Sequence, residues 1–270
     1  MASAVAPASG RRVEVDCRAG VLTLTLNRPD ALNAIDEETV CDIEQAFDTA
    51  EGDPQLVALV LGARGRVFSA GADLKAARAR ADDGSGQATT AFLARVTALF
   101  RRLERLPVPT IAVVNGLAVA GGLELVLCCD FVIASEAAAF GDAHANFGLL
   151  PGGGGSFRLP RRVGAMRAKQ MMFTGQTFPA AAAAAWGLVT IVVPPDGLDA
   201  AVEEMVQSLK SKSPLGLRRM KRLVDDGLDL SPEQGLANEQ AVSREHALSH
   251  DRREGLQAFN EKRRPVFLGR

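Results

Sequence analysis

The sequence lacks three features that would mark particular classes of protein: an excess of charge of one sign, a long apolar run and a metal-binding cysteine pattern. Its 270 residues carry 31 basic and 32 acidic side chains, so the chain has little electrostatic field with which to attract nucleic acid or an anionic membrane. No run of about 18 apolar residues occurs, which leaves no segment suited to crossing a bilayer as a helix. These absences favour a small molecule, or a second copy of the chain, as the partner.

The four cysteines have no metal-ligand spacing. Cys128 and Cys129 are adjacent in an apolar helical segment, where two neighbouring thiols are poorly placed to bond to each other. We therefore expect Cys17, Cys41, Cys128 and Cys129 to be buried, reduced thiols of a cytoplasmic protein.

The first ten residues, 1–10, are rich in alanine, serine and proline, and two arginines follow them. A short mitochondrial presequence is one interpretation, but the stretch is brief and lacks an amphipathic arginine pattern. A frayed terminus is the favoured interpretation.

Strand and helix signals alternate along the chain as far as Pro151. Apolar alternation predicts a hairpin from residues 13–15 and 21–26 around a turn at 18–20. Buried strands are predicted at 56–61, 110–114 and 131–134, and helices at 36–50, 91–106 and 122–129, the first of them capped by Asp36. Because strands alternate with helices, the pattern indicates an α/β body with a mainly parallel sheet.

After Pro151 the strand signals nearly stop, and helical spacing dominates. The predicted helical segments are 160–173, 179–186, 197–210, 214–227, 231–248 and 251–264. The alanine run at 180–185 suits a helix, and Trp186-Gly187 supplies an anchor and a stop. The remainder of the chain is therefore a helical extension, and no linker is long enough to separate two independent domains.

Two glycine-bearing stretches, residues 68–75 and 115–125, each read as a strand that ends in a small-residue turn and then opens a helix. The first N–H groups of a helix have no internal acceptor, so such turns present unpaired backbone donors. Two of these turns side by side could hold one negatively charged oxygen, and small residues would let a ligand approach the backbone. The chemistry indicated is stabilisation of an oxyanion, with the carboxylate of Glu124 close to one donor.

The order of these segments resembles that of the crotonase superfamily, also called the enoyl-CoA hydratase/isomerase family, from about Val13 to the C-terminus. The motifs that carry the resemblance are Leu26-Asn27-Arg28-Pro29 with Ala31-Leu32-Asn33, residues 70–75, residues 115–130, Phe140-Gly141, residues 151–155, Trp186-Gly187-Leu188-Val189, and Asp251-Arg252-Arg253-Glu254-Gly255 with Phe259 and Lys262. The resemblance implies a crotonase-like α/β fold, with a ββα spiral core and CoA site over residues 11–200 and a C-terminal helical trimerisation region over 201–270. It also implies a homotrimer or homohexamer, an acyl-CoA thioester as substrate, no metal, no cofactor other than the coenzyme A of the substrate, and a role in fatty-acid and lipid metabolism.

The same resemblance assigns site residues. The N–H groups of Ala72 and Gly121 are expected to form an oxyanion hole for a thioester carbonyl. The residues expected to line the coenzyme A track are Asp30, Ala31, Leu32, Ala70, Asp73, Leu74, Lys75, Phe259 and Lys262. Solvated helix charges are the alternative for Lys75 and Lys262. The glycine run 152–155 lacks the context of a phosphate-binding or dinucleotide-binding loop, and we expect a turn that floors the pocket.

The chain departs from the family at one catalytic position. Hydratases of this family usually place two glutamates over the acyl chain; here the first is Glu124, but the second position is His144. A histidine carries a proton at neutral pH more readily than a glutamate, so a proton-transfer group is kept while its charge and reach change. The alternative is a packed histidine held by a backbone carbonyl, through Asp142 or Asn146.

The leading interpretation is a lyase, a 2-enoyl-CoA hydratase or dehydratase, in which Glu124 handles water and His144 the proton at C2. Isomerisation, decarboxylation or carbon–carbon hydrolysis through the same thioester enolate is the first alternative, and for hydrolysis Asp142 is the only acidic residue near His144 in sequence. A non-catalytic acyl-CoA-binding protein is the second alternative. The sequence does not define the acyl chain, because the residues expected to cover it, at 77–92, belong to a variable loop.

Overall fold

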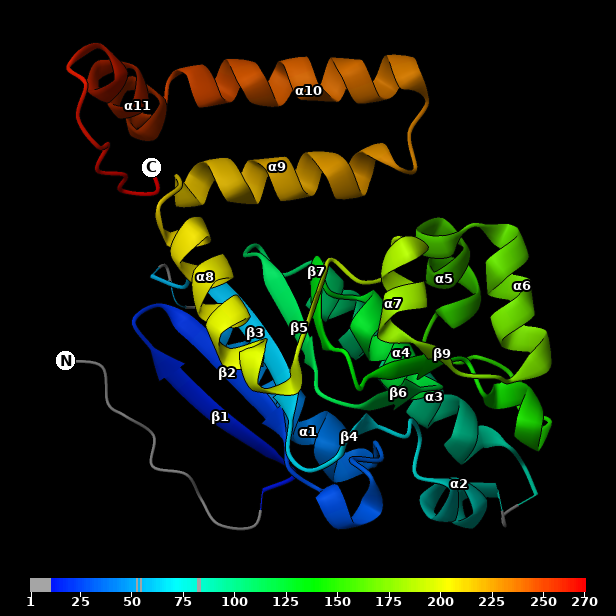
Figure 1. Cartoon of the computed structure of the whole chain (residues 1–270). Coiled ribbons are helices and arrows are strands. Elements are labelled where there is room, and N and C mark those ends of the chain that lie inside the picture. Colours follow the sequence, from blue (N-terminus) through cyan, green and yellow to red (C-terminus); the bar gives the residue numbers. More distant parts are fainter. Residues whose placement is uncertain (1–10, 52, 54, 82–83) are drawn as a thin grey trace. The chain divides into compact units, whose positions relative to one another are not determined.

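The computed structural model describes residues 11–51, 53, 55–81 and 84–270, and these residues form two units (Figure 1). The first unit comprises the described part of the chain up to residue 106 together with residues 110–203, and the second comprises 107–109 with 204–270. Residues 1–10, for which the sequence predicts a frayed terminus rather than a mitochondrial presequence, lie outside the described residues.

A six-stranded sheet forms the centre of the first unit. Its strands follow the order β1 (Val13–Arg18), β2 (Val21–Leu26), β3 (Ala58–Ala63), β5 (Thr110–Val114), β7 (Phe131–Ser135) and β10 (Ile191–Val193). The β1–β2 hairpin is antiparallel, as the alternation predicts, and every other neighbouring pair is parallel. The middle strands are almost continuously apolar and buried, which is expected of parallel strands covered on both faces.

A second, smaller sheet was not predicted from the sequence as a separate layer. It contains β4 (Val67–Ser69), β6 (Leu117–Val119), β8 (Ala139–Gly141) and β9 (Phe178–Pro179), in that order. The first three strands are parallel, and β9 is antiparallel to β8. Strands of two or three residues give almost no periodic signal, but this sheet sets the two glycine-bearing turns after β4 and β6 next to each other.

Helices lie beside the two sheets of the first unit (Figure 1). They are α1 (Glu37–Glu51), α2 (Leu74–Ala81), α3 (Gln87–Glu104), α4 (Gly121–Leu127), α5 (Gly155–Val163), α6 (Ala165–Thr174) and α7 (Ala180–Ala185), with short 3-10 helices η1 (Pro29–Ala31), η2 (His144–Phe147) and η3 (Pro195–Gly197). Asp36 caps α1 as predicted, because its Oδ1 accepts the N–H of Thr39 at 2.9 Å. The single helix expected at 160–173 is wrong: Gly164, with a φ of 82°, separates α5 from α6.

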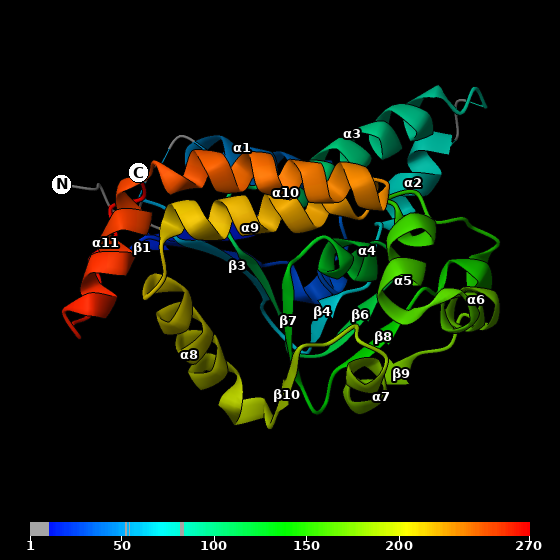
Figure 2. The ribbon, with the colours of Figure 1, turned by 90° about the horizontal axis from the view of Figure 1, so that it is seen from above.

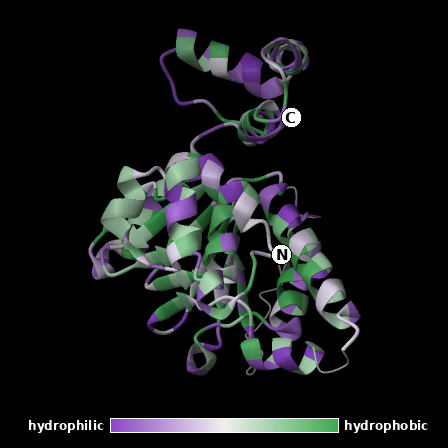
Figure 3. Ribbon diagram, turned by 90° about the vertical axis from the view of Figure 1, so that its right-hand side faces the viewer, coloured by the Kyte–Doolittle hydropathy of each residue, from purple (hydrophilic) through white to green (hydrophobic). Residues whose placement is uncertain are grey.

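The second unit is helical, as the sequence predicts. The helix α8 (Leu198–Lys210) leads into it, and α9 (Pro214–Gly227), α10 (Pro232–Ala247) and α11 (His250–Asn260) follow. Helices α9 and α10 pack side by side (Figure 2). Ser213, Ser231 and Ser249 each cap the following helix by accepting a backbone N–H three residues further on. The helices of this unit carry both hydrophobic (green) and hydrophilic (purple) residues (Figure 3), as amphipathic helices do.

None of the four cysteines, all of which the structure describes, forms a disulfide, but the expectation of burial holds for only two of them. Cys128 and Cys129 are buried, whereas Cys17 is exposed and Cys41 is half-buried. Cys17 lies in β1, a strand at the edge of the sheet, where one side has no neighbouring strand. Within the described parts of the chain, no helix is long and apolar enough to cross a membrane.

Candidate active site

The turns after β4 and β6 touch because Gly71 has no side chain. β4 and β6 pair in parallel, so both turns lie at the same end of the small sheet. A Cβ on Gly71 would lie 2.8 Å from the backbone nitrogen of Gly121 and 2.8 Å from the Cβ of Ala120. Gly71 also has a φ of 87°, which favours glycine. The predicted neighbourhood of the two turns is therefore present.

Hydrogen bonds fix the first turn on both sides of Ala72. The N–H of Ile35 donates to the carbonyl of Gly71 at 2.8 Å, and the N–H of Asp73 donates to the carbonyl of Ile35 at 3.0 Å. The hydroxyl of Ser69 accepts the N–H of Gly71 at 3.2 Å. Among the described residues, no acceptor takes the N–H of Ala72. The turn is therefore held rigidly while one backbone donor stays available.

The second donor is the N–H of Gly121 at the start of α4. The preceding residue, Ala120, donates its own N–H to Gly141 at 3.1 Å and has a φ of 49°. No described residue accepts the N–H of Gly121, as expected at a helix N-terminus. A Cβ built on Gly121 would lie 3.4 Å from the backbone nitrogen of Ala72, so the two free donors are adjacent. This arrangement suits the binding of one negatively charged oxygen.

Glu124 lies in the first turn of α4, and only 3% of its surface is exposed. Its Oε1 accepts the N–H groups of Gly153 and Gly155, each at 2.8 Å. A Cβ on Gly153 would lie 2.8 Å from Oε2, and a Cβ on Gly155 would lie 3.1 Å from Oε1. The glycine run thus forms a cradle for a carboxylate. Burial raises the pKa of Glu124 above its ordinary value, although the two N–H groups and the charge of His144 act in the opposite direction.

Arg158 supports the cradle from behind, and sequence reasoning missed it. Its Nη1 donates to the carbonyl of Gly153 at 2.7 Å, and its Nε and Nη2 each lie 2.9 Å from the carboxylate of Glu104. Arg158 is buried on the face of α5 that also buries Leu159 and Val163. A charge within the apolar stripe of a helix was the signal that could have identified it.

His144 opens η2, and 11% of its side chain is exposed. Its Nδ1 lies 3.0 Å from Oδ1 of Asp142. Asn146, the other candidate partner, donates instead to the carbonyl of Gly175 at 3.0 Å. Burial alone would lower the pKa of His144, but the hydrogen bond and charge of Asp142, with the charge of Glu124, raise it above the ordinary value. The ring of His144 is therefore held by the carboxylate of Asp142 rather than by a backbone carbonyl, and its part in proton transfer stays a prediction.

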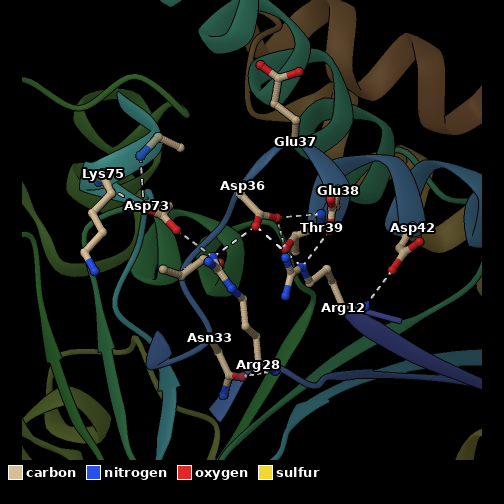
Figure 4. A network of polar contacts seen from close by, with 12 residues as sticks. Arg12, Arg28, Asn33, Asp36, Glu37, Glu38, Thr39, Asp42, Asp73 and Lys75 are labelled. Carbon is tan, nitrogen blue, oxygen red and sulfur yellow. Dashed lines mark hydrogen bonds and ion pairs between the residues drawn. The ribbon is translucent and has the colours of Figure 1, made fainter. Parts of the chain in front are cut away.

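An ion-pair network fastens the loop around η1 to the start of α2 (Figure 4). Arg28 Nη1 lies 2.7 Å from Asp73 Oδ2 and 3.0 Å from Asp36 Oδ2. The other oxygen of Asp73 caps α2 by accepting backbone N–H groups at 3.0 and 3.2 Å. Burial alone would raise the pKa of Asp73, but these N–H groups and the charge of Arg28 lower it. The carboxylate of Asp73 therefore already binds Arg28 and the backbone of α2. Its contact with coenzyme A stays a prediction.

The other residues predicted to line the coenzyme A track lie in two places. In the first unit the N–H of Ala70 donates to the carbonyl of Leu32 at 3.0 Å, which ties the η1 loop to the oxyanion turn. Asp30, Leu32, Leu74 and Lys75 are exposed near these segments, and Ala31 is half-buried. In the second unit Phe259 and Lys262 are exposed at the end of α11. Contact of any of these residues with coenzyme A stays a prediction.

Comparisons with known proteins agree with the resemblance noted in the sequence. The model of the family described as enoyl-CoA hydratase/isomerase matches residues 16–270. A crotonyl-CoA hydratase of Syntrophomonas wolfei is 35% identical over 248 residues, which cover 92% of this chain and 94% of that protein. The mitochondrial enoyl-CoA hydratase domain-containing protein 2 of Mus musculus is 36% identical over 93% of this chain and 85% of its own length. The crystal structure of an enoyl-CoA hydratase from Bacillus anthracis superimposes with a TM-score of 0.90 at 32% identity, covering 96% of this chain and 100% of that one.

Proposed function

We propose that this chain, which belongs to the enoyl-CoA hydratase/isomerase family, adds water to 2-enoyl-CoA thioesters or catalyses the reverse dehydration. The observation that carries the proposal is the pair of free N–H groups of Ala72 and Gly121 beside the buried carboxylate of Glu124. Addition of water at C3 places negative charge on the thioester oxygen. Two fixed N–H donors directed at that oxygen lower the activation barrier of the addition, because they stabilise negative charge that develops in the transition state.

Glu124 and His144 supply the proton transfers. Glu124 removes a proton from water as the water oxygen bonds to C3, and the electrons of the double bond move towards the thioester carbonyl. The resulting enolate takes a proton at C2 from protonated His144, which gives the 3-hydroxyacyl thioester. Glu124 now holds one extra proton and His144 lacks one, so transfer of that proton from Glu124 to His144 restores the starting state. Each positioned acid or base is commonly worth ~10²–10⁴ in rate.

One observation favours a second candidate reaction. The pairing of His144 with Asp142 at 3.0 Å is the arrangement in which a neutral histidine acts as a base oriented by a carboxylate. Carbon–carbon hydrolysis through the same thioester enolate would use the histidine in this way. The two candidates differ in the protonation state that His144 needs and in their products.

The assembly and location of the protein belong to the same proposal. Residues 201–270 form the trimerisation region of a homotrimer or homohexamer, supported by the apolar side chains that the second unit exposes. These include Met220, Val224, Leu228, Leu236, Leu248 and Leu256. Light scattering at micromolar concentration tests this assembly, and a monomer would contradict it. The four described cysteines form no disulfide, which agrees with a reducing compartment such as the cytoplasm. Fractionation of cells that express the tagged chain tests this location.

The decisive experiment is a panel of thioesters incubated with the purified protein. Straight-chain and branched 2-enoyl-CoA thioesters, crotonyl-CoA among them, are followed by loss of the conjugated double bond and by mass spectrometry of the products. A mass gain of one water without chain cleavage supports hydration. A 3-oxoacyl-CoA thioester in the same panel tests carbon–carbon hydrolysis, because attack of water on its C3 carbonyl breaks the C2–C3 bond and gives a carboxylic acid and a shorter acyl-CoA. Tight binding without turnover of any member would show a non-catalytic acyl-CoA-binding protein instead.

A further inference from the structure

Asp142 is a buried carboxylate with one oxygen committed to His144. It follows β8 directly, and 2% of its surface is exposed. Oδ1 lies 3.0 Å from Nδ1 of His144, while Oδ2 is buried and has no hydrogen-bond partner in the described parts of the chain. Burial of an ionised carboxylate is costly unless a charge or donor offsets it. The cation formed by His144 is the group placed to do so.

The contact also fixes which ring nitrogen faces outward. An ionised carboxylate only accepts hydrogen bonds, so Nδ1 must carry the hydrogen that lies between the two side chains. The other nitrogen, Nε2, makes no hydrogen bond with a described residue. The ring is thus oriented from one side and available on the other.

Among the residues that the structure describes, few charged groups lie around His144. Asp142 is on its own loop, and Glu124 comes from α4. The helix α6 packs against η2, and its charged residues, Arg167 and Lys169, are both exposed. In α5, buried Arg158 is paired with Glu104 and bound to the glycine cradle. Within the described part of the chain, two carboxylates therefore act on one imidazole.

The net charge of these three groups equals that of the usual pair of glutamates. A working pair of one carboxylate and one carboxylic acid carries a charge of −1. Ionised Asp142, ionised Glu124 and protonated His144 also sum to −1, whereas Glu124 and protonated His144 alone would be neutral. We infer that Asp142 is a positioning residue that keeps His144 protonated and turns its Nε2–H towards the substrate, so that the histidine can replace a carboxylic acid as the proton donor. This inference rests on the proposed hydration for its catalytic meaning, but its physical content can be tested without substrate.

The first test measures the pKa of His144 by deuterium exchange at the imidazole C2 carbon, with mass spectrometry of the peptides. The chain has only three histidines, and proteolysis separates His144 from His246 and His250. In the parent, His144 should titrate at a higher pH than His246, whose pKa is lowered by burial and by Arg219. This comparison needs no variant, and an equal or lower value for His144 would overturn the inference.

The variant Asp142→Asn removes the charge and keeps the shape. It should lower the pKa of His144 by about one unit or more, the usual effect of losing a close opposite charge. The matched control is Asp251→Asn, since Asp251 is also buried and its Oδ1 lies 3.5 Å from Nδ1 of His250. The control should leave His144 unchanged. An unchanged His144 in Asp142→Asn would refute the role of Asp142.

A second test measures the rate of hydration and compares the effect of Asp142→Asn in two backgrounds, the parent and the variant His144→Glu. In the parent, Asp142→Asn should lower the rate of hydration at a pH above the pKa of His144. The loss should be about tenfold for each unit by which that pKa falls, because a smaller fraction of His144 is protonated. In the His144→Glu background the same substitution should not lower hydration, since it removes a negative charge beside a second glutamate. A loss of equal size in both backgrounds would mean that Asp142 is only structural. If the exchange results hold and no 2-enoyl-CoA is hydrated, the proposed function fails while the assignment of Asp142 stands.

Discussion

The N–H of Gly153 donates to Oε1 of Glu124 at 2.8 Å, across 29 residues of sequence. A carboxylate that is almost wholly buried is therefore held by backbone rather than by a cationic side chain. This arrangement orients the carboxylate without cancelling its charge, which suits a general base.

Substitution of Gly153 tests this cradle. A Cβ in Gly153→Ala would lie 2.8 Å from Oε2 of Glu124 and 2.7 Å from the ring of Phe100, so the carboxylate or the turn must move. We expect turnover of the thioester substrate to fall by ~10² or more, because a misplaced base loses most of its effect. The matched control is Gly62→Ala, where a Cβ meets nothing within 4 Å. Equal turnover in both variants would show that the position of the carboxylate is not critical.

Glu124→Gln separates the charge of this residue from its shape. A glutamine oxygen can still accept the N–H groups of Gly153 and Gly155, so the fold around the site should persist. We expect turnover to drop by about 10² or more, equivalent to ~2.7 kcal/mol of transition-state stabilisation, because a general base is removed. Acyl-CoA binding, measured by calorimetry, should change little. Turnover within a few-fold of the parent would make Glu124 structural.

Replacement of His144 tests its role as the proton donor. His144→Gln should slow hydration and remove the alkaline limb of the pH profile. His144→Glu restores the usual pair of glutamates and should retain or raise hydration. Both variants leave the backbone donors of Ala72 and Gly121 in place, so binding of acyl-CoA serves as the control. A His144→Gln enzyme with the parental rate and pH profile would show that the histidine only packs, and hydration gained by His144→Glu from an inactive parent would point to another natural reaction.

The dependence of activity on pH follows from the directions of two pKa shifts. Glu124 must be ionised, and burial raises its pKa above the ordinary 4.5, so activity should fall on the acid side at a pH above 4.5. His144 must be protonated, and the net effect of its surroundings raises its pKa above the ordinary 6.5, so activity should persist past pH 6.5 before it falls. A profile of kcat/KM against pH for the free enzyme measures both limbs. An alkaline limb at or below pH 6.5 would contradict a protonated His144.

Local signals in the sequence determined a large part of the fold. The alternation of apolar residues located the β1–β2 hairpin, and the helix α9 begins and ends where its spacing predicts, at Pro214 and Gly227. Helix caps such as Asp36 bind backbone groups only a few residues away, so the local sequence is enough to predict where the helix begins. The two small-residue turns and the buried Glu124 could be identified because their signals are local as well. Each turn is marked by small residues that end a strand and open a helix, and an acidic residue within an apolar helix needs a local explanation.

Tertiary structure decided what depends on contacts between distant segments. The small sheet of β4, β6, β8 and β9 is built from strands too short to carry a periodic signal, and only their pairing places the free N–H groups of Ala72 and Gly121 together. The cradle of Glu124 joins residues 29 and 31 positions apart, and the pair of Arg158 with Glu104 joins residues 54 apart. The choice of Asp142 over Asn146 as the partner of His144 was open in the sequence because both are two residues away. Packing settled it, since Asn146 is drawn to the carbonyl of Gly175 while Asp142 is buried beside the imidazole.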